Sequence, residues 1–438
     1  MPDYLASVNR ELLRLALPNI LSNISVPLLS SVDTALMGHL SAAHLGAIGI
    51  GGMAFNFIYW NFGFLRMGTT GLTAQAVGAR DDSRQGTILV SASVLGLGIA
   101  LLLLAFQVPL LAAAQALLNT PTNQLDLVRE YFAIRILAAP AALLLYVLAG
   151  WFFGQQNAWI PLLVTTVANV VNIAVSVYLV QNLGLETSGV AWGTVIAQYA
   201  ALLIAATVLL WRYRSIVAGV RLAAALEWGN YRRLLQVNAD IFVRTLALTF
   251  AFGFVFSRSA SASALALATT TVLLQFLNWM SYAIDGFAYA AEALVGKTVG
   301  AQRPERTRQA IRLSFGYGGA CAVAFALVYA LFGEQLVSLF TDDASVQAFA
   351  KTLWPYLIAL PLVGTACYIW DGVFVGLTAT KAMRDTMFLS LVAYLSTYYA
   401  LRVPLGEVVA IWTALLVLLG SRGLLQTLWY HKRGLALR

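Results

Sequence analysis

The sequence predicts an all-α integral membrane protein with twelve transmembrane helices in two pseudo-symmetric lobes of six helices each. Three observations lead to this fold class. The chain is 60% hydrophobic and only 11% charged over 438 residues, whereas a soluble domain carries about 25% charged residues. Long apolar runs recur along it, each near the ~20 residues that a spanning helix needs. Sequence motifs also recur between its two halves.

The apolar runs divide into twelve expected spans. The first run continues through Pro18 and Pro27 to Asp33, so we expect a retained helix rather than a short, cleavable signal peptide. The eleventh run is the weakest, because it is short and ends beside Arg402. The spans are expected at residues 15–37, 45–67, 88–108, 131–153, 160–180, 189–210, 239–256, 265–284, 313–332, 353–375, 387–401 and 408–425.

The distribution of basic residues predicts the orientation. Lys and Arg gather in cytoplasmic loops of membrane proteins, and both termini are therefore expected to be cytoplasmic. The net charge of +8 then reflects membrane topology, and we expect no nucleic-acid partner. With this orientation, the Lys and Arg residues that fall in outer segments are Arg129, Arg258, Lys351 and Arg402.

The two halves carry the same motifs at a constant separation. The pattern Y-x3-G-x-F-x-G begins at Tyr146 and again at Tyr368, and V-G-A begins at Val77 and again at Val299, an offset of 222 in both cases. The sequence therefore predicts an N-terminal lobe at 1–212, a cytoplasmic linker at 213–234 and a C-terminal lobe at 235–438. Six spans per lobe make both halves enter the membrane in the same sense, which is typical of transporters with a substrate path between their halves.

Asp33 is the leading functional candidate. A charge at the bilayer centre costs about 2.5–3.5 kcal/mol on insertion scales, so such residues face a cavity or a partner. Pro27 removes one intrahelical hydrogen bond and, with Pro18, lets the first helix bend. A carboxylate beside a bend suits a proton switch, because burial favours its protonated form. The alternative is that Asp33 caps the outer end of the helix.

Polar residues on the fifth and sixth spans form a second candidate group. Asn172 and Ser176 are four residues apart and share a helix face with the adjacent Asn169. Thr194 and Gln198 repeat this spacing on the sixth span. These five residues are expected to line a cavity opposite the first helix, or else to form hydrogen bonds between helices.

Other residues of the predicted substrate cavity lie on the second and tenth spans. Met53 and Tyr59 are expected either to line the bottom of an apolar cavity that accepts varied compounds or to pack against lipid. Asp371 breaks the pseudo-symmetry, since the residue 222 positions earlier is Ala149. It is expected to be a second protonatable or substrate-facing group, or to pair with a basic or hydroxyl neighbour.

Four further charged residues are expected to be structural or to belong to a gate. Asp240 and Arg244 have the i,i+4 spacing of an intrahelical ion pair. Asp285 and Glu292 lie near the inner end of the eighth span.

No enzyme motif is present. The sequence has no Walker A loop, HExxH or GxSxG in a suitable context. Its two cysteines, Cys321 and Cys367, lie in apolar runs and suggest neither a metal site nor a disulfide framework. We expect a protein that is not an enzyme, holds no metal or cofactor, and draws its energy from an ion gradient.

Several stretches in both halves resemble the DinF-type branch of the MATE (multidrug and toxic compound extrusion) family. Two of these stretches are specific, L-R-M-G-T-T-G-L-T-A-Q-A from Leu65 and D-G-F-A-Y-A-A-E-A from Asp285. Shorter ones are P-L-L from Pro27, V-D-T-A from Val32, G-H-L from Gly38, and the residues around Asp371.

The resemblance implies a V-shaped antiporter in a bacterial cytoplasmic (inner) membrane. Such transporters exchange protons or sodium ions for bulky amphipathic, often cationic, drugs, and we expect a monomer. Asp33 matches the family's coupling carboxylate, and Asn172 and Thr194 match polar positions of the same lobe. Ser176 stands where many members carry Asp. A sodium ion wants several oxygen ligands and compensating charge, so this departure favours protons and makes sodium coupling the less favoured alternative.

Two other functions stay open. A flippase for lipids or lipid-linked oligosaccharides would have a strongly cationic central cavity, whereas only Arg135 and Arg244 lie within the expected spans once Arg66 and Arg422, near the inner ends of theirs, are counted with the inner segments. A non-transporting membrane scaffold would need neither pseudo-symmetric lobes nor a buried carboxylate.

Overall fold

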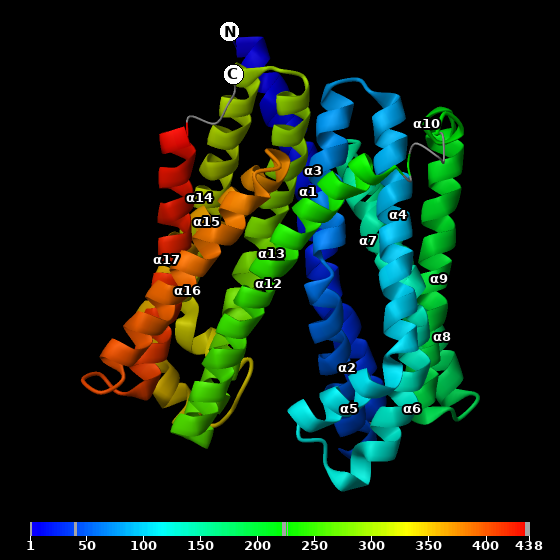
Figure 1. Cartoon of the computed structure of the whole chain (residues 1–438). Coiled ribbons are helices and arrows are strands. Elements are labelled where there is room, and N and C mark those ends of the chain that lie inside the picture. The colour runs from blue at the N-terminus through cyan, green and yellow to red at the C-terminus, as the bar shows by residue number, and fades with distance from the viewer. Residues whose placement is uncertain (1, 39–41, 221–224, 226, 434–438) are drawn as a thin grey trace. The chain divides into compact units, whose positions relative to one another are not determined.

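The computed structural model describes residues 2–38, 42–220, 225 and 227–433. All elements of this part are helices (Figure 1), which confirms the predicted all-α class. The elements are α1 (Pro2–Gly38), α2 (Ala42–Asn61), α3 (Phe64–Gly78), α4 (Asp82–Ala105), α5 (Gln107–Leu117), η1 (Thr122–Gln124), α6 (Leu125–Arg135), η2 (Ile136–Ala138), α7 (Ala139–Gly154), α8 (Trp159–Gln181), α9 (Glu186–Arg212), α10 (Arg214–Ala218), α12 (Trp228–Ala262), α13 (Ala264–Gly300), α14 (Pro304–Ser338), α15 (Ala344–Gly376), α16 (Thr380–Leu401) and α17 (Glu407–Arg433).

Each predicted span corresponds to a helical segment. Within the described residues, nine helices are long and apolar enough to cross a membrane. The remaining predicted spans lie on α1, on α16 and on the pair α2–α3, which a turn at Phe62 and Gly63 separates. The sequence did not predict α5, which occupies part of an expected outer loop.

The chain divides into two compact units, but not at the predicted lobe boundaries. Unit 1 contains Met1–Ile20 and Ala239–Arg438, and unit 2 contains Leu21–Asn238. The first turns of α1 therefore pack with the C-terminal half: in unit 1, Glu11 accepts a hydrogen bond from Lys297 (2.7 Å) and Asn9 accepts one from Tyr317 (2.7 Å). Within unit 1, the start of α1 and the end of α17 lie at the same end (Figure 1).

The predicted linker packs as part of unit 2. Ser91 on α4 donates a hydrogen bond to the carbonyl oxygen of Ala225 over 2.6 Å, and Ala225 is fully buried. Gly86, at the start of α4, leaves room for Val220, since a Cβ there would collide with it. These contacts explain why the boundary between the units falls within α12 instead of in the linker.

The internal repeat is visible in the packing of each unit. In unit 2, a Cβ on Gly150 of α7 would collide with the carbonyl oxygen of Arg66 on α3. In unit 1, a Cβ on Gly372 of α15 would collide with that of Ala288 on α13, and both pairs are related by the same offset of 222. Gly154 and Gly376 repeat this correspondence, against Thr73–Ala74 and Val295–Gly296. Small residues allow such close approach of membrane helices.

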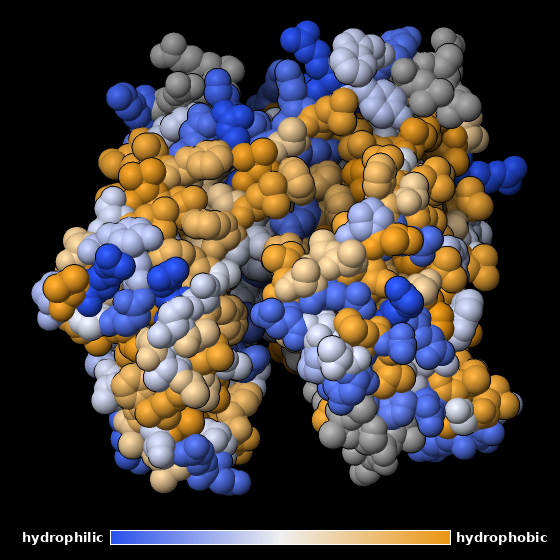
Figure 2. All heavy atoms as spheres, turned by 60° about the horizontal axis from the view of Figure 1, so that its bottom comes forward, coloured by the Kyte–Doolittle hydropathy of each residue, from blue (hydrophilic) through white to orange (hydrophobic). Residues whose placement is uncertain are grey.

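The outer surface of the helices is apolar. Large hydrophobic side chains such as Leu203 and Leu331 are about 70% exposed (69% and 70%). Figure 2 shows hydrophobic residues over the flanks of the helices and hydrophilic ones toward the helix ends. A soluble protein rarely exposes large contiguous apolar patches, so this surface fits contact with lipid.

The packing predicts which glycines are needed for stability. We expect Gly150→Ala and Gly372→Ala each to destabilise the protein by about 1–3 kcal/mol, because the added methyl group must displace a backbone. Thermal unfolding of the purified protein in detergent measures the effect. Gly98→Ala and Gly319→Ala are the matched controls, since a Cβ at either position meets nothing within 4 Å. Equal melting temperatures for all four variants would show that the close approach is not required.

Candidate functional site

A buried polar group joins α8 to α9 in unit 2. The side-chain amide of Asn172 donates to the hydroxyl of Thr194 over 2.9 Å. Asn172, Ser176 and Thr194 are 1%, 0% and 4% exposed. A Cβ at Gly193 of α9 would collide with the Ser176 hydroxyl, so the glycine allows the two helices this close approach. The structure thus brings together three of the five polar residues that the sequence grouped on these helices.

Two oxygen atoms of this group have no hydrogen-bond partner among the described residues. They are Oδ1 of Asn172 and Oγ of Ser176, and both are buried. Buried polar atoms in proteins are nearly always hydrogen-bonded, and leaving one unsatisfied costs about 1–3 kcal/mol. The group is therefore suited to accept a hydrogen bond from a protonated carboxyl group or a water molecule, or to coordinate a cation.

α1 lies beside α8 and runs in the same direction. The Ser22 hydroxyl donates to the Thr165 hydroxyl over 3.3 Å, and the amide of Asn169 donates to the carbonyl oxygen of Ser25 over 3.4 Å. The second contact lies about one turn further along both helices than the first. Asn169, a predicted cavity residue, thus contacts the helix that carries Asp33.

This pairing places the Asp33 backbone near the level of Ser176. Asp33 follows Ser25 by eight residues, and both helices rise about 1.5 Å per residue, so its level on α8 corresponds to residue 177. The side chains of Asp33 and Pro27 lie outside the described residues, although both positions are helical within α1. Pro18 is buried in the part of α1 that belongs to unit 1.

The other predicted cavity residues of unit 2 are not joined to this group by any hydrogen bond of the described residues. Gln198 lies one turn after Thr194 on α9 and is half-buried. Met53 is 53% exposed. Tyr59 packs against the ring of Phe55 at a centroid distance of 5.6 Å, and its hydroxyl is buried without a hydrogen-bond partner in the described part of the chain.

Asp371 is the centre of a buried charged cluster in unit 1. Its carboxylate forms ion pairs with Arg244 of α12 and with Arg422 of α17, the latter at 2.6 Å. Gln426 donates to its other oxygen over 2.9 Å. All four residues are at most 9% exposed. Two guanidinium groups therefore share this carboxylate.

The predicted Asp240–Arg244 ion pair was wrong. Asp240 instead pairs with Arg384 of α16 at 2.7 Å and accepts a hydrogen bond from Thr380 over 3.1 Å. Arg244 is drawn away because the buried Asp371 needs a counter-charge more than the partly exposed Asp240 does. The i,i+4 spacing is thus overridden by contacts between helices.

Asp285 and Glu292 lie on the C-terminal half of α13 in unit 1. Asp285 is half-buried and acts electrostatically on Arg244, so it contributes negative charge to the surroundings of the cluster. Glu292 is fully buried, in the turn of α13 whose backbone contacts Gly376.

Arg422 and Gln426 are the site residues that the sequence did not predict. Arg422 lies near the end of the last expected span and is only 2% exposed. The signal that could have revealed it is the spacing of Arg422 and Gln426, which are four residues apart at the end of the last span and so share a helix face.

The cluster predicts strong energetic coupling. We expect Asp371→Asn to cost about 3–5 kcal/mol, because it leaves two buried guanidinium groups uncompensated. Arg422→Gln should cost less, because Asp371 keeps its ion pair with Arg244. The double variant should lose much less than the sum of the two, as measured by thermal unfolding in a double-mutant cycle. The exposed pair Arg308–Glu305 is the control and should show little coupling. Additive effects at Asp371 and Arg422 would contradict the cluster.

Comparison with known proteins identifies the family. The MatE family model matches residues 18–178 and again residues 241–400, once in each half of the repeat. The chain is 38% identical to DNA damage-inducible protein F of Escherichia coli strain K12, over 97% of this chain and 93% of that protein. It is 26% identical to the probable multidrug resistance protein NorM of Caulobacter vibrioides, over 95% and 87% of the two chains.

Solved structures show the same fold. A MATE structure in the bent conformation superposes with a TM-score of 0.90 at 18% identity, covering 98% of this chain and 96% of the other. An outward-facing multidrug resistance MATE transporter gives 0.87 at 19% identity, covering 98% and 97%. These likenesses confirm the predicted fold class, and with the matches in sequence they show that this multi-pass membrane protein belongs to the MatE family of transporters and is of the DinF type.

Proposed function

We propose that this transporter exports bulky amphipathic, often cationic, compounds from the cytoplasm in exchange for protons, with Asp33 as the coupling carboxylate. Relatives named multidrug and toxin extrusion protein and multidrug resistance protein support the substrate class. The observation that carries the coupling proposal is the pair of buried oxygens on Asn172 and Ser176 that no described residue satisfies, near the level of Asp33 on the adjacent helix.

The residues around Asp33 favour protons over sodium. Asn172, Ser176 and Thr194 supply only uncharged oxygens, so Asp33 would be the one carboxylate of this group. A protonated Asp33 carboxyl can donate one hydrogen bond to an unsatisfied oxygen and needs no counter-charge. A sodium ion needs several oxygen ligands. Apart from Asp33, all the ligands that this group could offer are neutral oxygens, which compensate the charge of the ion poorly.

The exchange cycle follows from the cost of burying a charge. In the inward-open state, a deprotonated Asp33 attracts the cationic part of the substrate. After the transporter turns outward, a proton from outside neutralises the carboxyl group, which no longer holds the cation and can be buried as α1 bends near Pro27. After the transporter returns to the inward-open state, the proton leaves Asp33 on the inner side of the membrane. Each charge moved down 100 mV provides about 2.3 kcal/mol.

We further propose a supporting role for the cluster in unit 1. Because Asp371 is shared by Arg244 and Arg422, it holds α12, α15 and α17 together rather than exchanging a proton at each turnover. Met53, Tyr59, Asn169 and Gln198 remain our proposed substrate-cavity residues. The protein is proposed to act as a monomer in a bacterial cytoplasmic membrane with both termini inside.

The flippase alternative gains little from the structure. Arg422 adds a buried basic residue to Arg135 and Arg244 within the apolar helices, which would favour an anionic lipid-linked substrate. However, Arg422 and Arg244 are already neutralised in part by Asp371. The remaining candidate, Arg135, lies against the ring of Phe55 at 5.5 Å.

The coupling proposal predicts the loss of gradient-driven transport in one variant. In vesicles with an imposed pH gradient and no sodium, wild type should extrude a fluorescent cation, and Asp33→Asn should lose this activity by about tenfold or more, since it cannot release a proton. Asp342→Asn, at an exposed site, is the control and should transport normally. A wild type that works only after sodium is added would overturn the choice of proton.

The choice of ion is also predicted to depend on residue 176. Ser176→Asp restores the second carboxylate that many relatives carry there, so sodium should begin to stimulate transport by this variant at constant pH. Ser176→Ala removes only a hydroxyl and should remain insensitive to sodium. Efflux is measured at graded sodium concentrations in the same vesicles. Equal sodium responses in both variants would show that the neutral residue does not set the ion preference.

A further inference from the structure

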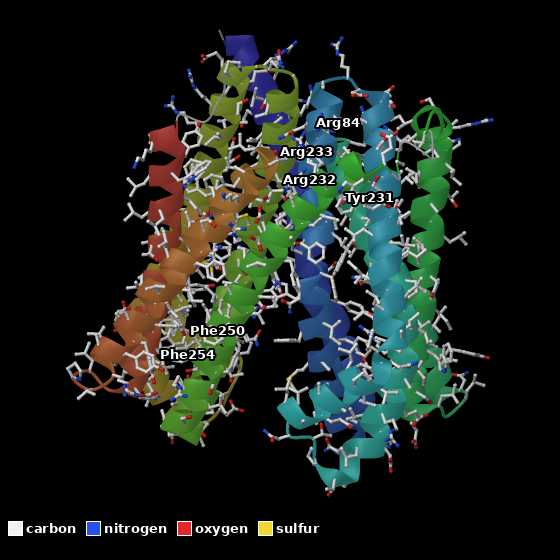
Figure 3. All side chains as sticks on the ribbon, viewed as in Figure 1. Arg84, Tyr231, Arg232, Arg233, Phe250 and Phe254 are labelled. Carbon is white, nitrogen blue, oxygen red and sulfur yellow. The ribbon has the colours of Figure 1, made fainter. Side chains whose placement is uncertain are left out.

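A pocket at one end of unit 2 lies apart from the polar group around Asn172. Three helices line it: α3, α4 and the start of α12. Arg84 and Thr87 come from α4, and Gly229 and Arg233 come from the first turns of α12. Figure 3 shows Arg84 and Arg233 at the same end of this unit.

The pocket is positively charged. Arg84 and Arg233 both line it, and the charge of Arg84 acts on Arg233. Neither residue forms an ion pair within the described part of the chain. Arg233 donates a long hydrogen bond of 3.5 Å to the uncharged side-chain oxygen of Gln75. Two guanidinium groups facing one space repel each other, so an anion placed between them would be stabilised.

The carboxylates close to Arg84 in sequence are engaged elsewhere. Asp81 caps α4 by accepting a hydrogen bond from the backbone N–H of Arg84 over 2.9 Å. Asp82 accepts one from the side chain of Gln85 over 3.2 Å. Both serve the N-terminus of the helix, and neither forms an ion pair with the Arg84 guanidinium.

The remaining lining suits a phosphate joined to an apolar body. At Gly229 an added Cβ would meet nothing within 4 Å, so the backbone of the first turn of α12 is open, and N–H groups at a helix start favour anions. The other walls are apolar, formed by Leu72, Ile88 and Leu234. A free inorganic ion would leave these apolar walls uncovered, whereas a lipid would cover them.

We propose that this pocket binds the phosphate of an anionic phospholipid through Arg84 and Arg233. Guanidinium groups bind phosphate oxygens in pairs of parallel hydrogen bonds, and basic pockets between helices on the cytoplasmic side of membrane proteins bind lipid headgroups. The basic end of unit 2 is the predicted cytoplasmic side, where anionic lipids are found. The proposal is independent of which ion drives transport.

Lipid-dependent thermal stability tests this site. The purified protein in neutral detergent is titrated with phosphatidylglycerol, with phosphatidylcholine as the neutral lipid and with glycerol phosphate as the soluble phosphate ester. Wild type is compared with Arg84→Gln/Arg233→Gln. The control is Arg212→Gln/Arg214→Gln, which removes the same charge from unit 2 at residues that do not line the pocket. Retention of lipid is measured independently by native mass spectrometry.

We expect phosphatidylglycerol to raise the melting temperature of wild type and the control, and to bind the pocket variant at least about tenfold more weakly. Phosphatidylcholine should act equally on all three proteins, which also shows that the pocket variant is folded. An equal loss in both double variants would overturn the site, because it would reflect general surface charge. Equal stabilisation by glycerol phosphate would overturn the lipid assignment in favour of a soluble phosphate ester.

Discussion

The cost of placing polar groups in an apolar environment governs this structure. Inside a membrane, an unpaired charge or hydrogen-bonding group cannot be compensated by water. The two units respond differently. In unit 1, Asp371 is fully engaged by Arg244, Arg422 and Gln426. In unit 2, Asn172 and Ser176 each keep a buried oxygen that no described residue satisfies, at the contact between α8 and α9. A saturated cluster suits a permanent structural role, while unsatisfied acceptors suit a ligand that comes and goes.

The repeat explains why two such different polar groups occur on one architecture. Gly150 and Gly372 hold equivalent helix pairs at the same close distance in each unit, so the backbone framework is duplicated. The polar residues are not duplicated with it, since Asp371 corresponds to Ala149. This difference fits our proposal that unit 2 exchanges ions, while the charged cluster of unit 1 holds helices together.

Much of the fold could be predicted from the sequence, because apolar length and the motif offset are local signals. The break between α2 and α3 at Gly63 and the extra helix α5 were missed, since turns within apolar runs carry little signal. For the site, helical spacing predicted a polar face on each of the helices that carry Asn172 and Thr194, and a hydrogen bond between them was one of the two expected outcomes. The ion-pair partner of Arg244 could not be predicted, because contacts between helices that are distant in sequence, such as α12, α15 and α17, leave no pattern in local residue spacing. Likewise, the packing of Met1–Ile20 with the C-terminal half depends on tertiary contacts alone.

The central claim is that proton and substrate compete through Asp33, and proton release on substrate binding tests it most directly. A fluorescent cation is added to the purified protein in weakly buffered detergent solution at a pH where Asp33 is protonated, and the released protons are counted with a pH indicator. The account predicts release of about one proton per bound cation in wild type and none in Asp33→Asn. Substrate binding to wild type without proton release, or equal release by the variant, would contradict it.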